Sequence, residues 1–246
     1  MAINKESNGY IIGFATVMVV VVGALLAFIA MALKPAQTEN VQNEKKQYIL
    51  KAIDVNVDRA IAGAEFNKYV KRRVIMSYDG KVVSDKSGEI SKTDLEDAFN
   101  IDLLKEYKTI SNKEERNYPL FICEKEGKTY YVVPTMGTGL WAAVWGYIGF
   151  EQDFNTIYSA VFDHKSETPG LGSEIATDMF SDQFKGKALA SGGKYKSVRV
   201  VKPGVPLDNH SVDGISGGTF TSVGVDEMIK RTAEVYYNYF QNNKTI

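Results

Sequence analysis

The residues best suited to chemistry in this chain lie between Ser211 and Ser222, where glycines, one aspartate and several hydroxyl side chains are crowded together. Glycine allows positive φ angles and lets another molecule approach the main chain closely. Thr219 and Thr221 stand at the start of a helical pattern, where unpaired N–H groups and the helix dipole favour a phosphate. The spacing fits a phosphate-binding loop, and it equally fits a glycine-rich turn followed by an ordinary helix cap.

Two further segments could hold a ring-shaped ligand. Residues 136–141 place Leu140 and Trp141 on a glycine loop after a predicted strand. Residues 164–172, His-Lys-Ser-Glu-Thr-Pro-Gly-Leu-Gly, form a polar turn stiffened by a Pro-Gly bend. The alternative interpretations are a tryptophan that anchors the core and an ordinary surface loop.

Composition excludes several classes of site. The net charge is −1, with 29 basic and 30 acidic residues, so no basic surplus suggests nucleic-acid binding. Cys123 is the only cysteine, which excludes an internal disulfide, a zinc site or an iron–sulfur cluster carried by this chain alone. The two histidines have no ligand spacing around them, so no metal site is predicted.

Residues 11–33 carry no charge, and as a helix they are long enough to span a bilayer. Lys34 and Pro35 are expected to end this helix. A cleaved signal peptide is the alternative, but its apolar segment is expected to be only about 7–15 residues long. We therefore expect a retained transmembrane anchor.

The rest of the chain predicts one α+β domain on a stalk. The expected division is a short segment at 1–10, the membrane helix at 11–33, a helical linker at 34–67 and the domain at 68–246. Alternating patterns and turn residues predict further helix over 60–74, a hairpin around Asp79-Gly80 and a helix over 93–106. They also predict strands at 118–125, 128–134, 144–150, 156–163, 187–189 and 195–201, and a closing helix over 225–241.

The stretch from Asp213 to Ser222 resembles the flavinylation motif of the FMN-binding domain family, Asp-Gly-x-Ser-Gly-Ala-Thr-x-Thr-Ser. It departs from that motif only at Gly218, where the family has alanine. In the family a flavin transferase joins the phosphate of FMN to the first threonine as a phosphoester. The resemblance implies that Thr219 is the attachment residue, with Thr221 as the fallback.

The turn at 164–172 also resembles this family, and Gly-x-Gly-Leu-Trp followed by residues 146–150 is similar to C subunits of sodium-translocating NADH:quinone reductases. The resemblance covers the anchor, the overall length and about the last 115 residues. It implies that Leu140, Trp141, Glu167, Thr168, Gly170 and Leu171 line the flavin, and that Lys202, Asp213, Ser216, Gly217 and Gly218 lie at the attachment loop.

The implied function is an electron relay that carries covalent FMN and passes single electrons between the cofactors of partner subunits during NADH oxidation, quinone reduction and sodium export. The implied partners are the other subunits of a six-subunit membrane complex and a flavin transferase. Charge around residues 11–33 weakly favours a cytoplasmic domain, whereas the resemblance implies a periplasmic domain on a single-pass anchor in the bacterial inner membrane. The alternatives are an Rnf-type G subunit and an anchored module that binds FMN noncovalently.

Overall fold

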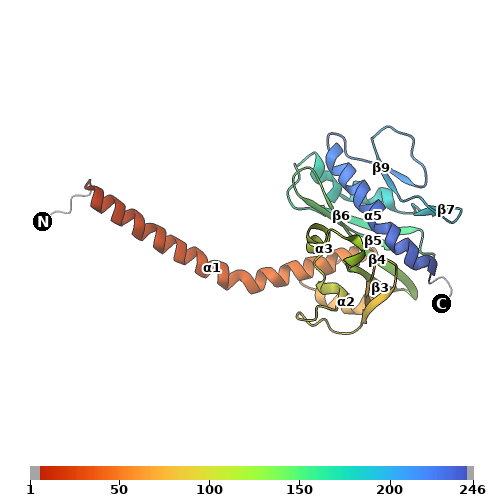
Figure 1. Ribbon diagram of the computed structural model, residues 1–246, viewed down its shortest axis with the longest axis horizontal. Helices are drawn as coiled ribbons and strands as arrows, with labels where there is room; N and C mark the ends of the chain where they lie inside the picture. Colours follow the sequence, from red (N-terminus) through yellow and green to blue (C-terminus); the bar gives the residue numbers. More distant parts are fainter. Residues whose placement is uncertain (1–5, 243–246) are drawn as a thin grey trace. The chain divides into compact units, whose positions relative to one another are not determined.

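The structure, a computed structural model, describes residues 6–242, which form two compact units divided between Glu44 and Lys45. Figure 1 shows its helices and strands along the chain. They are α1 (Asn8–Lys51), α2 (Ala62–Tyr69), β1 (Val70–Met76), β2 (Val82–Lys86), η1 (Ala98–Asn100), α3 (Leu103–Thr109), η2 (Lys113–Glu115), β3 (Tyr118–Lys125), β4 (Lys128–Thr138), β5 (Ala143–Phe150), β6 (Ile157–His164), η3 (Gly172–Ala176), α4 (Asp178–Ser181), η4 (Asp182–Phe184), β7 (Ala190–Ser191), β8 (Lys194–Tyr195), β9 (Arg199–Val201), β10 (Ser211–Asp213) and α5 (Thr219–Asn242).

Helix α1 is the one helix within residues 6–242 that is long and apolar enough to cross a membrane, by length and composition. The expected end at Lys34 and Pro35 is wrong, because the helix continues through Pro35 to Lys51. Proline removes one backbone donor, but good helix formers stand on both sides of it. The linker expected over 34–67 also differs, since Ile49 and Phe66 are buried in the second unit.

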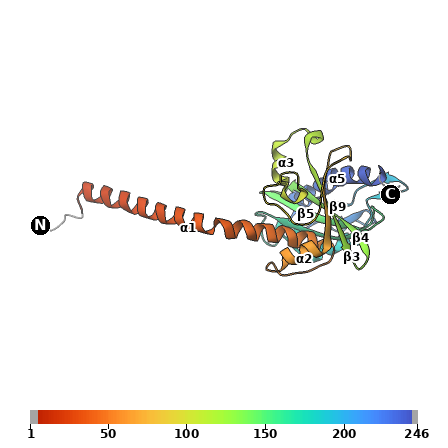
Figure 2. The same ribbon diagram turned by 90° about the horizontal axis from the view of Figure 1, so that it is seen from below.

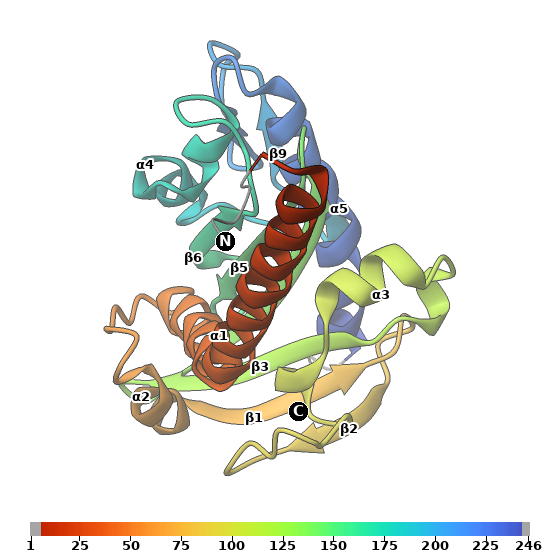
Figure 3. The ribbon, with the colours of Figure 1, turned by 90° about the vertical axis from the view of Figure 1, so that its left-hand side faces the viewer.

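The second unit is built on a six-stranded sheet in the order β2-β1-β3-β4-β5-β6, with every neighbouring pair antiparallel. Figure 3 shows β2, β1 and β3 side by side at one edge. The hairpin around Gly80 and the strands predicted at 118–125, 128–134, 144–150 and 156–163 are confirmed. The strand expected over 187–189 is reduced to an isolated bridge at Ala188, and the strand expected over 195–201 is interrupted between β8 and β9. At the turn between β3 and β4, both Glu126 and Gly127 have positive φ, as a two-residue hairpin turn of type I′ requires.

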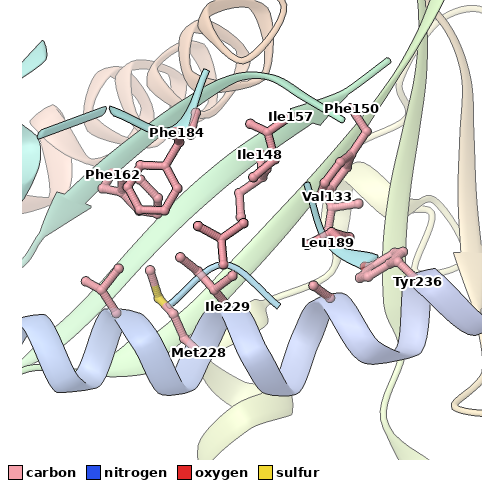
Figure 4. Close-up of a cluster of buried hydrophobic side chains, with 14 of the residues drawn as sticks. Val133, Ile148, Phe150, Ile157, Phe162, Phe184, Leu189, Met228, Ile229 and Tyr236 are labelled. Atoms are coloured by element: carbon pink, nitrogen blue, oxygen red, sulfur yellow. The ribbon is translucent and has the colours of Figure 1, made fainter. Parts of the chain in front are cut away.

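Both faces of the sheet are buried, because successive side chains of a strand point to opposite sides. On β3, Leu120 packs into the core beneath α5, and the next residue, Phe121, packs into the core beside α2 and the end of α1. Figure 2 shows α5 and α2 on opposite sides of the strands. In Figure 4, Met228, Ile229 and Tyr236 of α5 face the sheet.

Two predicted helices are confirmed only in part. Of the helix expected over 60–74, residues 62–69 form α2. Residues 70–74 belong to strand β1, where they pair with β3. The helix expected over 93–106 is two short pieces, η1 and α3, capped by the side chains of Asp97 and Asp102. Asp97 is unavailable for a longer helix because it pairs with Arg73 of β1, with both side chains almost fully buried, at 1% and 2% exposed.

The Arg73–Asp97 pair generates a stability prediction. Asp97→Ala leaves the buried Arg73 guanidinium without its partner, so we expect a loss of about 3–5 kcal/mol in the free energy of unfolding. The matched control is Asp85→Ala, which removes the partner of the neighbouring but exposed Arg72 and should cost about 0–1 kcal/mol. Urea unfolding of both variants measures the difference, and equal losses would contradict it.

Candidate functional site

The glycine-rich stretch singled out in the sequence leads directly into α5, whose first residue is Thr219. Its backbone is held at two places. Gly214 N–H donates to the carbonyl of Val201 at 2.7 Å, and Ile215 N–H donates to Oγ of Ser222 at 2.8 Å. The loop is therefore tied both to strand β9 and to the first turn of α5.

The two threonines of this stretch have different surroundings. Thr219 is exposed, and its side chain makes no hydrogen bond to another residue in the described part of the chain. Thr221 is 1% exposed, and its hydroxyl donates to Oε2 of Glu167 at 2.6 Å. Only the Thr219 hydroxyl is open to an incoming group.

Glu167 lies at the centre of this arrangement, and its side chain is only 5% exposed. Its Oε1 accepts hydrogen bonds from the backbone N–H groups of Trp141 and Ala142, at 3.0 and 3.3 Å. The carboxylate thus faces the protein, although the family resemblance implied that it lines the flavin.

Two glycines make room for that carboxylate. A Cβ at Gly139 would lie 2.6 Å from Oε1 of Glu167, and a Cβ at Gly172 would lie 2.6 Å from Oε2 and 2.4 Å from Oγ1 of Thr221. All three distances are far below van der Waals contact. The glycine at each position is required because the neighbouring backbone approaches the carboxylate closely.

Opposing effects act on the pKa of Glu167. Burial raises the pKa, whereas hydrogen bonds from the Thr221 hydroxyl and the backbone of Trp141 and Ala142 lower it, and the net result is a pKa below the ordinary value of 4.5. The group is therefore a carboxylate at neutral pH.

Large apolar side chains are exposed on three segments that meet at the start of α5. This apolar surface includes Leu140 and Trp141 from the β4–β5 loop, Leu171 from the 164–172 turn, and Phe220 from α5, with Trp141 70% exposed. Leu171 packs close to Gly217, where an added Cβ would lie 2.7 Å from its Cδ2. Large exposed apolar side chains gathered in one place mark a binding surface.

A cavity of about 300 Å³ opens beside Thr219. Its mostly apolar wall is completed by the exposed Lys202. The lining residues come from the end of β9, the glycine-rich loop and the first turns of α5: Val200, Val201, Lys202, Pro203, Gly214, Ile215, Thr219, Ser222 and Val223.

The remaining predicted residues have mixed positions. Thr168, Gly170 and Ser216 are exposed near the apolar surface, and Gly218 is buried. Asp213 is half-buried, and its Oδ1 is a buried atom that makes no hydrogen bond within residues 6–242.

Sequence reasoning missed three contributors to the site. His164 accepts the backbone N–H of Glu167 at its Nδ1, at 3.1 Å. Gly172 provides space for the carboxylate, and Ser222 fixes the loop. All three stand inside the quoted motifs, but no spacing rule distinguishes these contacts from solvent-exposed positions.

The chain is similar to known proteins both in sequence and in fold. Residues 139–234 match the family model of the FMN-binding domain. The chain is similar to the C subunit of the Na(+)-translocating NADH-quinone reductase of Pseudomonas aeruginosa, at 30% identity over 245 residues, covering 92% of this chain and 91% of that protein. It is also similar to the C subunit of the Vibrio alginolyticus reductase, at 26% identity, covering 90% of this chain and 87% of that protein.

Two crystal structures have the same fold. The C subunit of the Parabacteroides distasonis reductase aligns with a TM-score of 0.73 and 39% identity, covering 84% of this chain and 96% of that one. NqrC of Shewanella oneidensis aligns with a TM-score of 0.64 and 29% identity, covering 82% and 98%. The chain belongs to the family of C subunits of the Na(+)-translocating NADH-quinone reductases, and its predicted α+β fold is confirmed.

The pKa of Glu167 gives a prediction on acid stability. A carboxyl group with a lowered folded pKa stabilises the fold above its unfolded pKa of 4.5, and this contribution is lost as the pH falls through the folded value. The free energy of unfolding of the wild-type chain should therefore be higher than that of Glu167→Gln, and the difference should be largest near neutral pH. Urea unfolding at several pH values tests this, and a difference that grows on acidification would contradict it.

Proposed function

We propose that this chain carries FMN as an electron-transfer subunit of a Na(+)-translocating NADH-quinone reductase, with the flavin phosphate esterified to Thr219. One observation carries the proposal. The Thr219 hydroxyl is exposed at the first residue of α5, while Thr221, two residues on, is buried and donates to Glu167.

The residues around Thr219 fit a flavin. Leu140, Trp141 and Leu171 present exposed apolar side chains, and a planar aromatic ring would cover them and keep water from its faces. The hydroxyl of Thr168 is exposed in the same turn as Leu171 and is free to hydrogen-bond the polar edge of the ring.

The phosphate would also meet suitable groups. Thr219 begins a 24-residue helix, so the phosphate would lie at a helix N-terminus, where backbone N–H groups and the helix dipole favour negative charge. The ammonium of Lys202, on the wall of the adjoining cavity, supplies a positive charge on the same side. Ser216, Gly217 and Gly218 let the loop approach the phosphate closely.

The attachment is a phosphoryl transfer. The Thr219 oxygen forms a bond to phosphorus, the bond between phosphorus and the leaving nucleotide of a flavin dinucleotide breaks, and the hydroxyl proton passes to a base of the transferring enzyme. Within residues 6–242, no side chain hydrogen-bonds the Thr219 hydroxyl to serve as that base. We therefore infer that a separate flavin transferase is needed.

Bound FMN supplies the ability to accept and donate electrons one at a time. The protein holds the ring in place, excludes water from its faces and keeps it from being lost at each turnover. Partner subunits then supply the electron donor and the acceptor, and sodium passes through those subunits.

We also propose that residues 11–33 of α1 anchor the chain in the bacterial inner membrane and that the domain lies in the periplasm. The length and apolar composition of α1 support a membrane span, and the family supports a membrane complex. The positive charges that flank residues 11–33 weakly favour the opposite orientation, with a cytoplasmic domain. Large domains, however, cross membranes largely regardless of charge.

The attachment site is tested by intact mass. Co-expression with a flavin transferase should add about 438 Da, the mass of FMN less water, and Thr219→Ala should lose this adduct completely because the reacting oxygen is gone. Thr221→Ser should retain it. An adduct that persists in Thr219→Ala and disappears in Thr221→Ala would move the attachment to Thr221.

The orientation is tested by labelling of cysteine in whole cells. Cys123 is buried, so the wild-type chain should not react with a membrane-impermeant maleimide and serves as the control. Glu89 is exposed, and Glu89→Cys should react in intact cells if the domain is periplasmic. Labelling that occurs only after the cells are lysed would place the domain in the cytoplasm.

A further inference from the structure

We infer that Glu167 and Thr221 act as a pair of positioning residues. Together they fix the β4–β5 loop, which carries Trp141, relative to helix α5, which carries the proposed attachment residue Thr219. The inference rests on the proposed function, and it assigns to both residues a role that does not involve contact with the flavin.

The contacts define the link. One oxygen of the Glu167 carboxylate accepts the N–H of Trp141 at 3.0 Å, and the other accepts the hydroxyl of Thr221 at 2.6 Å. A single buried side chain thus joins the β4–β5 loop to the first turn of α5. Hydrogen bonds to a charged acceptor are roughly twice as strong as neutral ones, and they fix geometry most firmly where water is excluded.

The link also fixes the separation between Trp141 and Thr219, the two residues that the flavin would contact at its ring and its phosphate. Trp141 belongs to the proposed seat of the ring, and Thr219 would hold the phosphate. The FMN molecule would therefore span the same two segments that Glu167 and Thr221 join inside the protein. If the internal link were broken, the ring would remain attached but its distance from Trp141 would no longer be fixed.

Further contacts support this assignment. His164 accepts the backbone N–H of Glu167 at 3.1 Å, so the turn that carries the carboxylate is itself held. On the helix side, a Cβ at Gly224 would lie 2.1 Å from the carbonyl oxygen of Thr138, so α5 and the end of β4 are in close contact. The Thr221 hydroxyl lies at this junction, where its loss would not be compensated by water.

The experiment compares full-length variants that have been co-expressed with a flavin transferase. Thr221→Val keeps the size of the side chain but removes its hydroxyl, and Thr221→Ser restores a hydroxyl. Thr232→Val is the matched control, because Thr232 lies on the same helix and its side chain makes no hydrogen bond within residues 6–242. Intact mass measures attachment, and flavin fluorescence with visible circular dichroism measures the surroundings of the ring.

We expect all three variants to carry the adduct. In Thr221→Val, flavin fluorescence should rise about twofold or more as the quenching indole separates from the ring, since the buried carboxylate has lost a hydrogen bond. Thr221→Ser and Thr232→Val should match the wild-type chain. Thr221→Ala, which adds no new atom, replaces Thr221→Val if that variant does not fold.

The possible failures are distinguishable. A wild-type chain without the adduct would overturn the proposed function itself. A wild-type chain with the adduct, together with a Thr221→Val variant whose fluorescence and circular dichroism are unchanged, would overturn only the positioning role. A change of equal size in Thr232→Val would also overturn it, because the effect would then come from the helix in general.

Discussion

The buried carboxylate of Glu167 is the contact on which the geometry of the site depends. A charged group removed from water must recover its lost hydrogen bonds within the protein. Glu167 makes no ion pair with any residue in 6–242, and its bonds come instead from two backbone N–H groups and one hydroxyl. Because these donors belong to different segments, neither segment can move without leaving the charge unsatisfied.

The rest of the domain keeps those segments in place. The β4–β5 loop is fixed by a long antiparallel pairing in which Thr138 lies opposite Ala143. Helix α5 is fixed by its apolar face, which packs on the same strands through Met228 and Ile229. The site is therefore built on the ends of rigid elements, which hold functional groups more accurately than long loops do.

Much of this fold could be predicted from the sequence, because its signals are local. Alternating apolar residues indicate the central strands, Glu126 and Gly127 indicate a hairpin, and a regular apolar face indicates the closing helix. One error arose where a distant residue decides the local structure. Nothing near residue 97 shows that Arg73, far away in the sequence, will pair with Asp97 and so interrupt a helical pattern.

The site was predictable only in part, for a related reason. The motifs single out candidate residues, but they do not show the direction in which each side chain points. Each helical residue turns the chain by about 100°, so Thr219 and Thr221 lie on nearly opposite sides of α5, one outside and one inside. Glu167 lies in a polar turn and would be expected to face solvent, yet its partners hold it in the interior.

The exposed position of Thr219 also affects whether the proposed attachment of the cofactor can follow folding. The hydroxyl is at the surface of the finished domain, so no part of residues 6–242 has to unfold for a modifying enzyme to reach it. Under the proposed function, folding can thus be completed before the cofactor is attached. If Thr219 is the attachment residue proposed above, a chain that was not modified at synthesis would remain a substrate afterwards, and the number of redox-active copies could be set after folding.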